Sequence, residues 1–449
     1  MKTLYQKART MKSLKEHFQP YLSLMTKPSG KKLFLLLLSM TSMQFITSIS
    51  HLYKWFLSDV CGSSLNSYYY LLSYVTLPLD AFLKVTVRKA VALIPKELAG
   101  LPVLLVIDDT LQAKFGTHFE CYQTMFDHAR HNGSSFLKGH CFVALTINVP
   151  VVIGKEIRYL SVPLAFRLRG RDESKLLMAS RLVDAAMEEL RDYPMAILLC
   201  DSWYPKSHVL KTVERHENLD LIANMRVDTC LYDLPPPRTK KRGRPAKKGG
   251  RIDLRKDMSF ILVGGYHVAV RRAMTNLFQH PVYVTVTSPN LENPNSFRLF
   301  VSTLMPEAIE KQFRGHERRL SDSLNAQMTW TLPLFVYSFR WSIEVCFYEM
   351  KTFWSFGSYL LRSKRGVENY VSLIAMNYAG MRILPLSDPQ FASLADESVQ
   401  TAKYAIGNAV QQELFLWRFV SKTETGDNCR DFFKIVAESG LDFKHSKAS

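Results

Sequence analysis

The segment Val103-Leu-Leu-Val-Ile-Asp-Asp-Thr110 decides the fold class. Five apolar residues followed by two acids and a threonine are typical of a strand that is buried on both faces. The pattern returns at residues 196–201, which read Ala-Ile-Leu-Leu-Cys-Asp. Central strands of an α/β sheet commonly carry chemistry at their carboxyl ends. The two segments therefore predict an α/β fold with acidic side chains along one sheet edge.

The surrounding residues extend this sheet. Stretches rich in Val, Ile, Phe and Tyr predict further strands, and apolar residues at helical spacing predict helices between them. In chain order the expected elements are strands at 103–107, 140–149 and 157–168, a helix at 174–191, a strand at 196–200, a helix at 206–217 and a strand at 219–225. This order predicts a mixed sheet flanked by helices.

The chain divides into segments that differ in their pattern of apolar residues. Before the sheet, apolar stretches at 33–49, 51–60 and 68–94 predict a helical bundle of its own. After the sheet, the alternating segments 260–270, 281–287 and 298–303 predict a β-rich insertion, and helices are expected at 334–354, 366–384 and 397–419. We expect five segments: 1–98 N-terminal helical DNA-binding domain, 99–226 first part of the catalytic core, 227–333 β-rich basic insertion, 334–386 C-terminal helices of the core, and 387–449 C-terminal helical tail.

The expected helix at 334–354 carries four chemically loaded side chains on one face. Tyr337, Arg340, Glu344 and Lys351 follow the spacing Y-x2-R-x3-E-x6-K. At about 100° per residue, the last three fall within roughly 60° of Tyr337. A carboxylate flanked by two cations and a phenol suits a metal ion and a phosphate together. The alternative is a surface helix with ordinary ion pairs.

Two segments hold most of the positive charge. The chain of 449 residues has a net charge of +18. Residues 1–32 contain eight Lys or Arg and one acid, and residues 238–256 contain ten Lys or Arg and one acid. Such runs favour a polyanionic partner, with nucleic acid first, although a solvated linker is the alternative. Within the second run, Arg242 and Arg244 resemble the core of an AT-hook, which leaves minor-groove insertion and plain phosphate contact both open.

Other classes of protein find little support. Seven cysteines without paired spacing indicate reduced thiols. The apolar run at 33–38 breaks into polar residues too soon for a membrane span, so we expect no membrane association. Walker-type and dinucleotide-binding motifs are absent from the sequence.

Three carboxylates form a candidate metal site. Asp109 and Asp201 close the two buried strands, and Glu344 lies on the charged helix. Acids gathered in this way hold Mg²⁺ and activate water or a 3′-hydroxyl for attack at phosphorus. Asp108 stands beside Asp109, and strand alternation does not decide between them. For each strand acid alone, a turn or helix-capping role is the alternative.

These motifs resemble the insertion-sequence DDE transposases that carry the Y-x2-R-x3-E-x6-K signature. The match at Tyr337 to Lys351 is full, and both strand acids stand in the family's context. The family's first acid typically ends a strand and precedes Thr, so the resemblance implies Asp109, which Thr110 follows directly, as the first acid. Residues 361–365, Leu-Arg-Ser-Lys-Arg, and 138–142, Lys-Gly-His-Cys-Phe, are also similar to the family. The resemblance covers roughly residues 100–385.

The resemblance implies an RNase H-like catalytic core that a β-strand insertion interrupts between the second acid and Glu344. It implies that Asp109, Asp201 and Glu344 bind two Mg²⁺ ions, with Mn²⁺ as a substitute. Tyr337, Arg340 and Lys351 would contact phosphates at the transposon end. The implied partner is double-stranded DNA, both transposon ends and target, and the implied assembly is a homodimer in a synaptic complex. A location in the bacterial cytoplasm, at the nucleoid, would follow.

The expected activity is cut-and-paste transposition, in which the enzyme binds terminal inverted repeats, cleaves the DNA and joins the strands. Two alternatives stay open. One is an RNase H-like nuclease or resolvase without strand transfer, and the other is a catalytically idle DNA-binding protein derived from a transposase. The route of excision, through a hairpin or otherwise, is open too.

Overall fold

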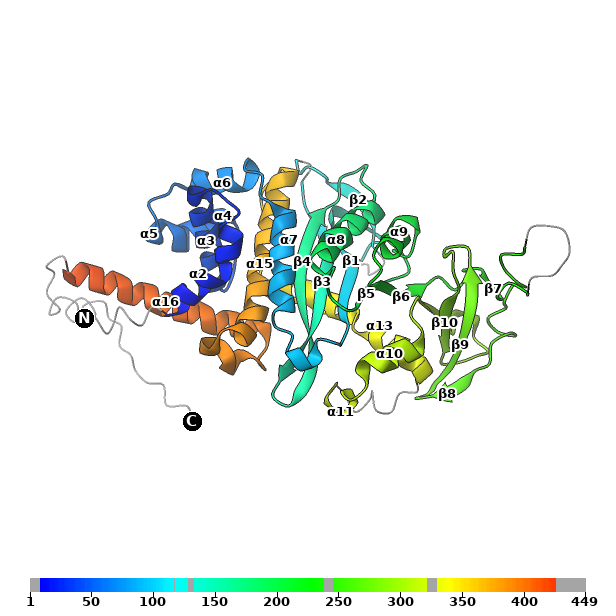
Figure 1. The fold of residues 1–449 in the computed structure, drawn as a ribbon. Helices are drawn as coiled ribbons and strands as arrows, with labels where there is room; N and C mark the ends of the chain where they lie inside the picture. Colours follow the sequence, from blue (N-terminus) through cyan, green and yellow to red (C-terminus); the bar gives the residue numbers. More distant parts are fainter. Residues whose placement is uncertain (1–8, 117, 128–132, 238–244, 321–328, 425–449) are drawn as a thin grey trace, which may run out of the picture.

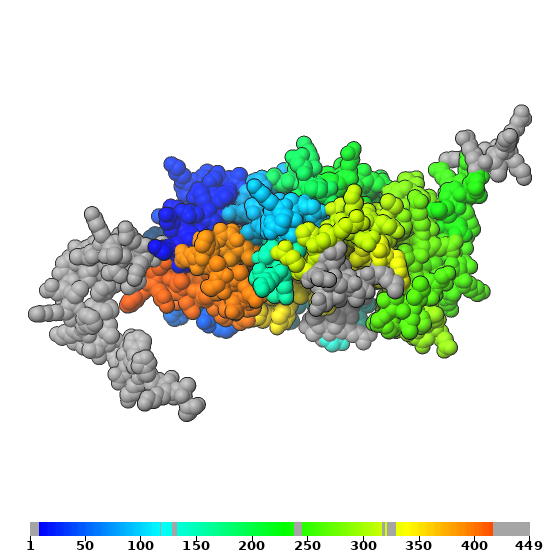
Figure 2. Space-filling model, turned by 60° about the horizontal axis from the view of Figure 1, so that its bottom comes forward, coloured from blue at the N-terminus to red at the C-terminus, as the bar shows by residue number. Residues whose placement is uncertain are grey.

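The computed structural model describes residues 9–116, 118–127, 133–237, 245–320 and 329–424. The molecule is elongated, with the sheet running through its middle (Figure 1). The N-terminal helices and α16 (Val399–Glu424) lie at one end, and the strands of the insertion lie at the other. The same two ends are seen in a second view, in blue and orange on one side and green on the other (Figure 2).

One mixed sheet of eleven strands organises the protein. Its order is β2-β3-β1-β5-β6-β11-β10-β9-β7, with β4 on β3 and β8 on β9. β1 runs antiparallel to β3 and parallel to β5, which is parallel to β6. The strands are β1 (Val103–Ala113), β2 (Gln123–Phe126), β3 (Phe136–Ile153), β4 (Glu156–Leu168), β5 (Ala196–Cys200), β6 (Leu219–Met225), β7 (Leu231–Tyr232), β8 (Ile261–Val263), β9 (Tyr266–Thr275), β10 (Val282–Ser288) and β11 (Arg298–Ser302).

The mixed α/β architecture predicted from the sequence is confirmed, and it is consistent with an RNase H-like core. β1 and β5 are buried on both faces, as their continuous apolar sequences predicted. Leu104 and Val106 enter the hydrophobic core on one side of the sheet, and Val103, Leu105 and Ile107 enter the core on the other side. Alternation along β1 therefore sends Asp108 and Asp109 to opposite faces.

The insertion is β-rich, as expected, but it continues the central sheet. β11 pairs antiparallel with β6, with Leu299 opposite Met225 and Ser302 opposite Ile222. The single strand expected at 260–270 is wrong, because β8 and β9 form a hairpin there. Gly264 and Gly265 make the turn with φ angles of 55° and 83°, which only glycine adopts without strain.

Helices cover both faces of the sheet. On one face lie α8 (Lys175–Glu189) and α9 (Ser207–Arg215), and on the other lie α14 (Trp341–Phe353) and α15 (Lys364–Ser387). The remaining helical elements near the sheet are short. They are η2 (Lys96–Leu98), η3 (Pro294–Ser296), α10 (Pro306–Phe313), α11 (Glu317–Leu320), η4 (Thr329–Thr331), α13 (Leu332–Ser338) and η5 (Pro389–Leu394).

The N-terminal residues are helical, as expected, but they share a core with the C-terminal helices. The backbone N–H groups of Thr10 and Met11 donate to the Glu413 carboxylate on α16. The stretch expected at 68–94 breaks before Pro78, and an unexpected helix begins at Arg9. The elements are α2 (Arg9–Leu22), α3 (Lys27–Ser42), α4 (Ile49–Leu52), the π-helical turn η1 (Tyr53–Leu57), α5 (Ser58–Val60), α6 (Leu65–Ser73) and α7 (Leu79–Val91). Among the described residues, none of the helices has the length and apolar character that a bilayer crossing requires.

One buried amide on α15 bonds to α3 and to Trp354, the residue that follows α14. The Asn377 side chain on α15 donates to Leu37 O at 2.9 Å and to Thr41 Oγ1 at 2.7 Å, and it accepts a hydrogen bond from Trp354 Nε1 at 2.7 Å. We expect Asn377→Ala to lower the free energy of unfolding by about 3 kcal/mol, because buried polar groups lose their partners. Urea unfolding followed by circular dichroism measures this. Asn66→Ala on the exposed side of α6 is the control, with a change under about 0.5 kcal/mol. Equal losses for the two variants would contradict the role of the amide.

Candidate active site

Register brings two acids together at the sheet edge. Ile107 of β1 lies opposite Cys200 of β5 in the parallel pairing, so Asp108 and Asp201 follow side by side. Neighbouring strands lie about 4.8 Å apart. Asp201 continues the face of β5 that Ile197 and Leu199 occupy, and this is the face of Leu104, Val106 and Asp108 on β1. The helices that cover this face include α14.

The Asp108 carboxylate is buried and paired with a cation. Its Oδ2 lies 2.7 Å from Arg340 Nη1, and its Oδ1 accepts the N–H of Asp109 at 2.8 Å. Burial and the carboxylates of Asp201 and Glu344 raise the pKa of Asp108 well above its usual value, although Arg340 opposes the shift. Burial also raises the pKa of Asp201, against the hydrogen bond from Trp203 N at 3.0 Å.

Asp109 has different partners on the opposite face of the sheet. Its carboxylate accepts two hydrogen bonds from Lys175 Nζ, at 3.0 and 3.1 Å, and one from the Tyr204 hydroxyl at 3.0 Å. Lys175 begins α8, and Tyr204 is fully buried. The geometry thus joins Asp108, and not the expected Asp109, to the residues of the charged helix.

The charged helix is two helices. The single helix expected at 334–354 is wrong, because α13 ends at Ser338 and α14 begins at Trp341. Around the break, the N–H groups of Arg340 and Ile343 bond three residues back, to Tyr337 and Arg340. The Phe339 carbonyl accepts a hydrogen bond from Asn148 Nδ2 on β3 at 3.3 Å. The same carbonyl accepts the backbone N–H of Ser342 at 3.1 Å, and Asn148 Nδ2 also donates to Ser342 Oγ at 2.9 Å, so the side chain from the sheet anchors the break at two points.

The four residues of the signature still gather near the acids. Arg340 Nη1 lies 2.7 Å from Asp108 and 3.5 Å from Glu344, so its guanidinium bridges the two carboxylates. Lys351 Nζ donates to Leu111 O on β1 at 3.0 Å, and burial lowers the Lys351 pKa. Tyr337 packs edge-on against Phe300 of β11 with ring centroids 5.0 Å apart, and burial raises its pKa. Of the two acids that Arg340 contacts, Glu344 is more exposed than Asp108, with 38% of its side chain accessible.

Several residues of the site could not be identified from the sequence. Lys175, Tyr204 and Asn148 hold the strand ends and the helix break, yet none of them belongs to a motif. Strand alternation indicates that Asp108 and Asp109 face apart, but it does not reveal which face α14 covers. Arg242 and Arg244 lie outside the described residues.

The donor set fits a divalent metal ion by its chemistry. Asp108, Asp201 and Glu344 supply only carboxylate oxygens, the ligands that Mg²⁺ prefers. The three carboxylates repel one another, and the one cation that contacts them in the geometry above is Arg340. The remaining negative charge is one that a metal ion would balance. In the conformation described for residues 9–424 with their gaps, no three His, Cys, Asp or Glu side chains are grouped closely enough to enclose an ion. Arg340 lies between two of the three acids.

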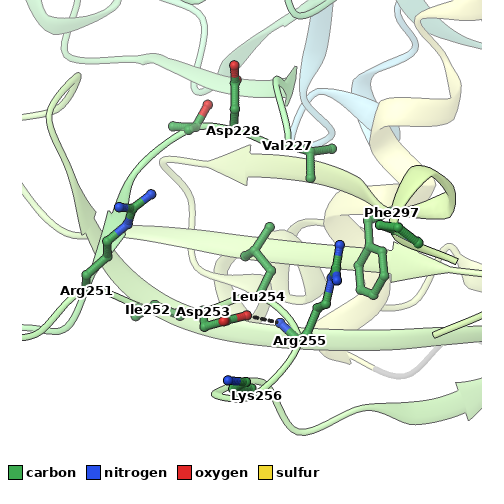
Figure 3. A pocket seen from close by; sticks show the side chains of 11 residues that line it. Val227, Asp228, Arg251, Ile252, Asp253, Leu254, Arg255, Lys256 and Phe297 are labelled. Carbon is green, nitrogen blue, oxygen red and sulfur yellow. Dashed lines mark hydrogen bonds between the residues drawn. The ribbon is translucent and has the colours of Figure 1, made fainter. Parts of the chain in front are cut away.

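A second basic surface lies in the insertion, apart from the acids. A hollow of about 680 Å³ is lined by Arg251, Arg255 and Lys256 together with Asp228 and Asp253, and Phe297 lies beside Arg255 (Figure 3). Asp253 Oδ1 accepts the N–H of Arg255 at 2.9 Å, which shapes the turn. These cations belong to the basic run at 238–256.

Residues 35–261 match a protein-family model described as DDE superfamily endonuclease. The chain belongs to this family. The match spans both strand acids and ends before α14, so it includes Asp108, Asp109 and Asp201 but not Glu344. No curated protein matches the chain.

Membership in the DDE endonuclease family identifies the class of reaction. It supports a nuclease or transposase enzyme that acts on DNA, and enzymes of this family generally use divalent metal ions such as Mg²⁺. The buried carboxylates at the sheet edge are suited to that chemistry.

Proposed function

We propose that this DDE endonuclease is a DNA transposase that binds terminal inverted repeats, cleaves DNA at the transposon ends and joins them to target DNA. The observation that carries the proposal is the position of Arg340, whose guanidinium contacts Asp108 and Glu344 beside the strand that leads to Asp201. The full Y-x2-R-x3-E-x6-K spacing on α13 and α14 supports the transposase reading over other nucleases.

In this proposal Asp108 replaces Asp109 as the first catalytic acid. Asp108, Asp201 and Glu344 would hold two Mg²⁺ ions, with Mn²⁺ as a substitute. The ions supply Lewis-acid stabilisation of the attacking and leaving oxygens of an in-line displacement. Asp109 would hold the end of β1 in position through Lys175 and Tyr204.

The cations beside the acids would bind DNA phosphates. Arg340 offers a planar fork that suits a phosphate, and Lys351 offers a point charge about three helical turns further along. Burial lowers the Lys351 pKa and thus disfavours the charged form of its amine. A bound phosphate would act in the opposite direction and favour the charged form. Tyr337 would donate its hydroxyl to the same backbone. Each contact orients the strand so that the scissile phosphate faces the carboxylates.

Two basic surfaces would bind the DNA further from the cut. Arg251, Arg255 and Lys256 of the hollow, with Arg242 and Arg244 of the same run, would contact phosphates, and the N-terminal helical domain would contribute to recognition of the ends. A homodimer is expected, since two ends must be held in one complex. Action at the bacterial nucleoid would follow from such a substrate.

The test is an assay with Mg²⁺ and a duplex that carries the repeats flanking the gene. We expect cleaved and strand-joined products from the parent protein, and neither product from Asp201→Asn or Glu344→Gln. Cleavage without any joined product would favour a nuclease or resolvase. DNA binding with no cleavage in Mg²⁺ or Mn²⁺ would favour a catalytically idle DNA-binding protein. Full cleavage by Asp201→Asn would show that the assignment of Asp201 as a catalytic acid is wrong.

A further inference from the structure

A large aromatic side chain stands exposed next to the acids. Trp203 lies in the loop between β5 and α9, and its backbone N–H donates to Asp201 Oδ1 at 3.0 Å. Its side chain is 49% exposed, whereas the next residue, Tyr204, is fully buried and donates to Asp109. The hydrogen bond from Trp203 N to Asp201 and the one from the Tyr204 hydroxyl to Asp109 fix the backbone at this point. The exposed indole is therefore held close to both acids.

Two lysines accompany the indole ring. Lys206 Nζ lies 3.8 Å from the ring centroid, and Lys175 Nζ lies 4.9 Å from it. Lys175 is also bound to the Asp109 carboxylate, so its charge is partly compensated. Lys206 adds a further cation close to the indole ring, beside the carboxylates of the site. An exposed aromatic ring beside a cation is the combination that binds a nucleobase and its phosphate.

We propose that Trp203 is a stacking platform for one base of the DNA strand whose phosphate lies at the acids, and that Lys206 contacts a phosphate next to that base. Trp203 is in this view a positioning residue: its backbone is tied to Asp201, so a base stacked on the indole sets the distance from the strand to that carboxylate. The assignment rests on the proposed function, because it needs DNA at this edge of the sheet. Stacking on an aromatic ring tolerates any base, so the platform would position the strand rather than read its sequence.

The test uses 2-aminopurine, a base whose fluorescence falls when it stacks. The probe is a duplex carrying the repeat that flanks the gene, with 2-aminopurine at each position around the cut in turn, and Ca²⁺ in place of Mg²⁺. We expect quenching at one position with the parent protein. Trp203→Ala should abolish that quenching and raise Kd about tenfold, and Trp203→Phe should retain most of it. Lys206→Ala should raise Kd and leave the position of quenching unchanged.

The matched control is Trp55→Ala. Trp55 is 60% exposed and has Lys54 Nζ 5.0 Å from its ring centroid, but it lies in η1, between α4 and α5. Both of these helices lie far from β5 (Figure 1). Trp55→Ala should leave the quenched position unchanged even if the overall affinity falls. If both Trp203 variants retain the parent's quenching and Kd, the platform is wrong, whether or not the protein cleaves DNA. If the parent cleaves no DNA yet Trp203→Ala abolishes the quenching, the platform stands and the proposed activity fails.

Discussion

Replacing Asp108 with asparagine is expected to lower the rate of Mg²⁺-dependent DNA cleavage about a thousandfold. The reason is the loss of a carboxylate that would bind the ion, since metal-assisted charge stabilisation contributes several kcal/mol to the barrier. Asparagine keeps the size of the side chain and can still accept one of the two hydrogen bonds, from Arg340 or from the N–H of Asp109, which different carboxylate oxygens accept in the parent. Single-turnover cleavage of a labelled duplex measures the rate.

Asp109→Asn is the matched control for Asp108→Asn. Both carboxylates are largely buried, both accept a hydrogen bond from a cation, and they are adjacent in the chain. Asp109→Asn should change the cleavage rate less than about tenfold and lower the free energy of unfolding by about 1–3 kcal/mol, because Lys175 loses its counter-charge. The reverse result, with Asp109→Asn inactive and Asp108→Asn active, would restore Asp109 as the catalytic acid.

Replacing Arg340 with alanine is expected to change two affinities in opposite directions. Arg340 bridges Asp108 and Glu344 at 2.7 and 3.5 Å, so without it the two carboxylates should bind Mn²⁺ about tenfold more tightly in the absence of DNA. The same change removes the proposed phosphate contact, and cleavage should slow about a hundredfold. Titration calorimetry with Mn²⁺ measures the first effect, and single-turnover cleavage measures the second.

Arg340→Lys separates charge from shape in this experiment. Lysine keeps the cation near the acids but loses the planar fork. The Mn²⁺ affinity of this variant should stay close to that of the parent, while cleavage still slows. A Mn²⁺ affinity that is the same in Arg340→Ala and the parent would mean that the guanidinium does not compete with the ion.

Much of the fold was predictable because short-range patterns determine it. The apolar runs before Asp108 and Asp201 can be buried only as central strands, so both strands and the sheet edge followed from the sequence. The face of each acid did not follow, because it depends on which side α14 packs. The break between α13 and α14 was also hidden, since the side chain that contacts it, Asn148, is almost two hundred residues away in the chain.

The continuous sheet has a mechanical consequence. β6 runs parallel to β5, toward the edge that carries Asp201, and β11 pairs with it through four residue pairs, with Thr303 Oγ1 further bonded to Asp220 at 2.7 Å. A hinge between the insertion and the acids would have to break this ladder, whose bonds form one cooperative unit. The insertion should therefore act as a rigid lever. A force that DNA exerts on its far strands would reach the carboxylates as a torque on the whole sheet, because no flexible linker lies along β6 and β11 to absorb it.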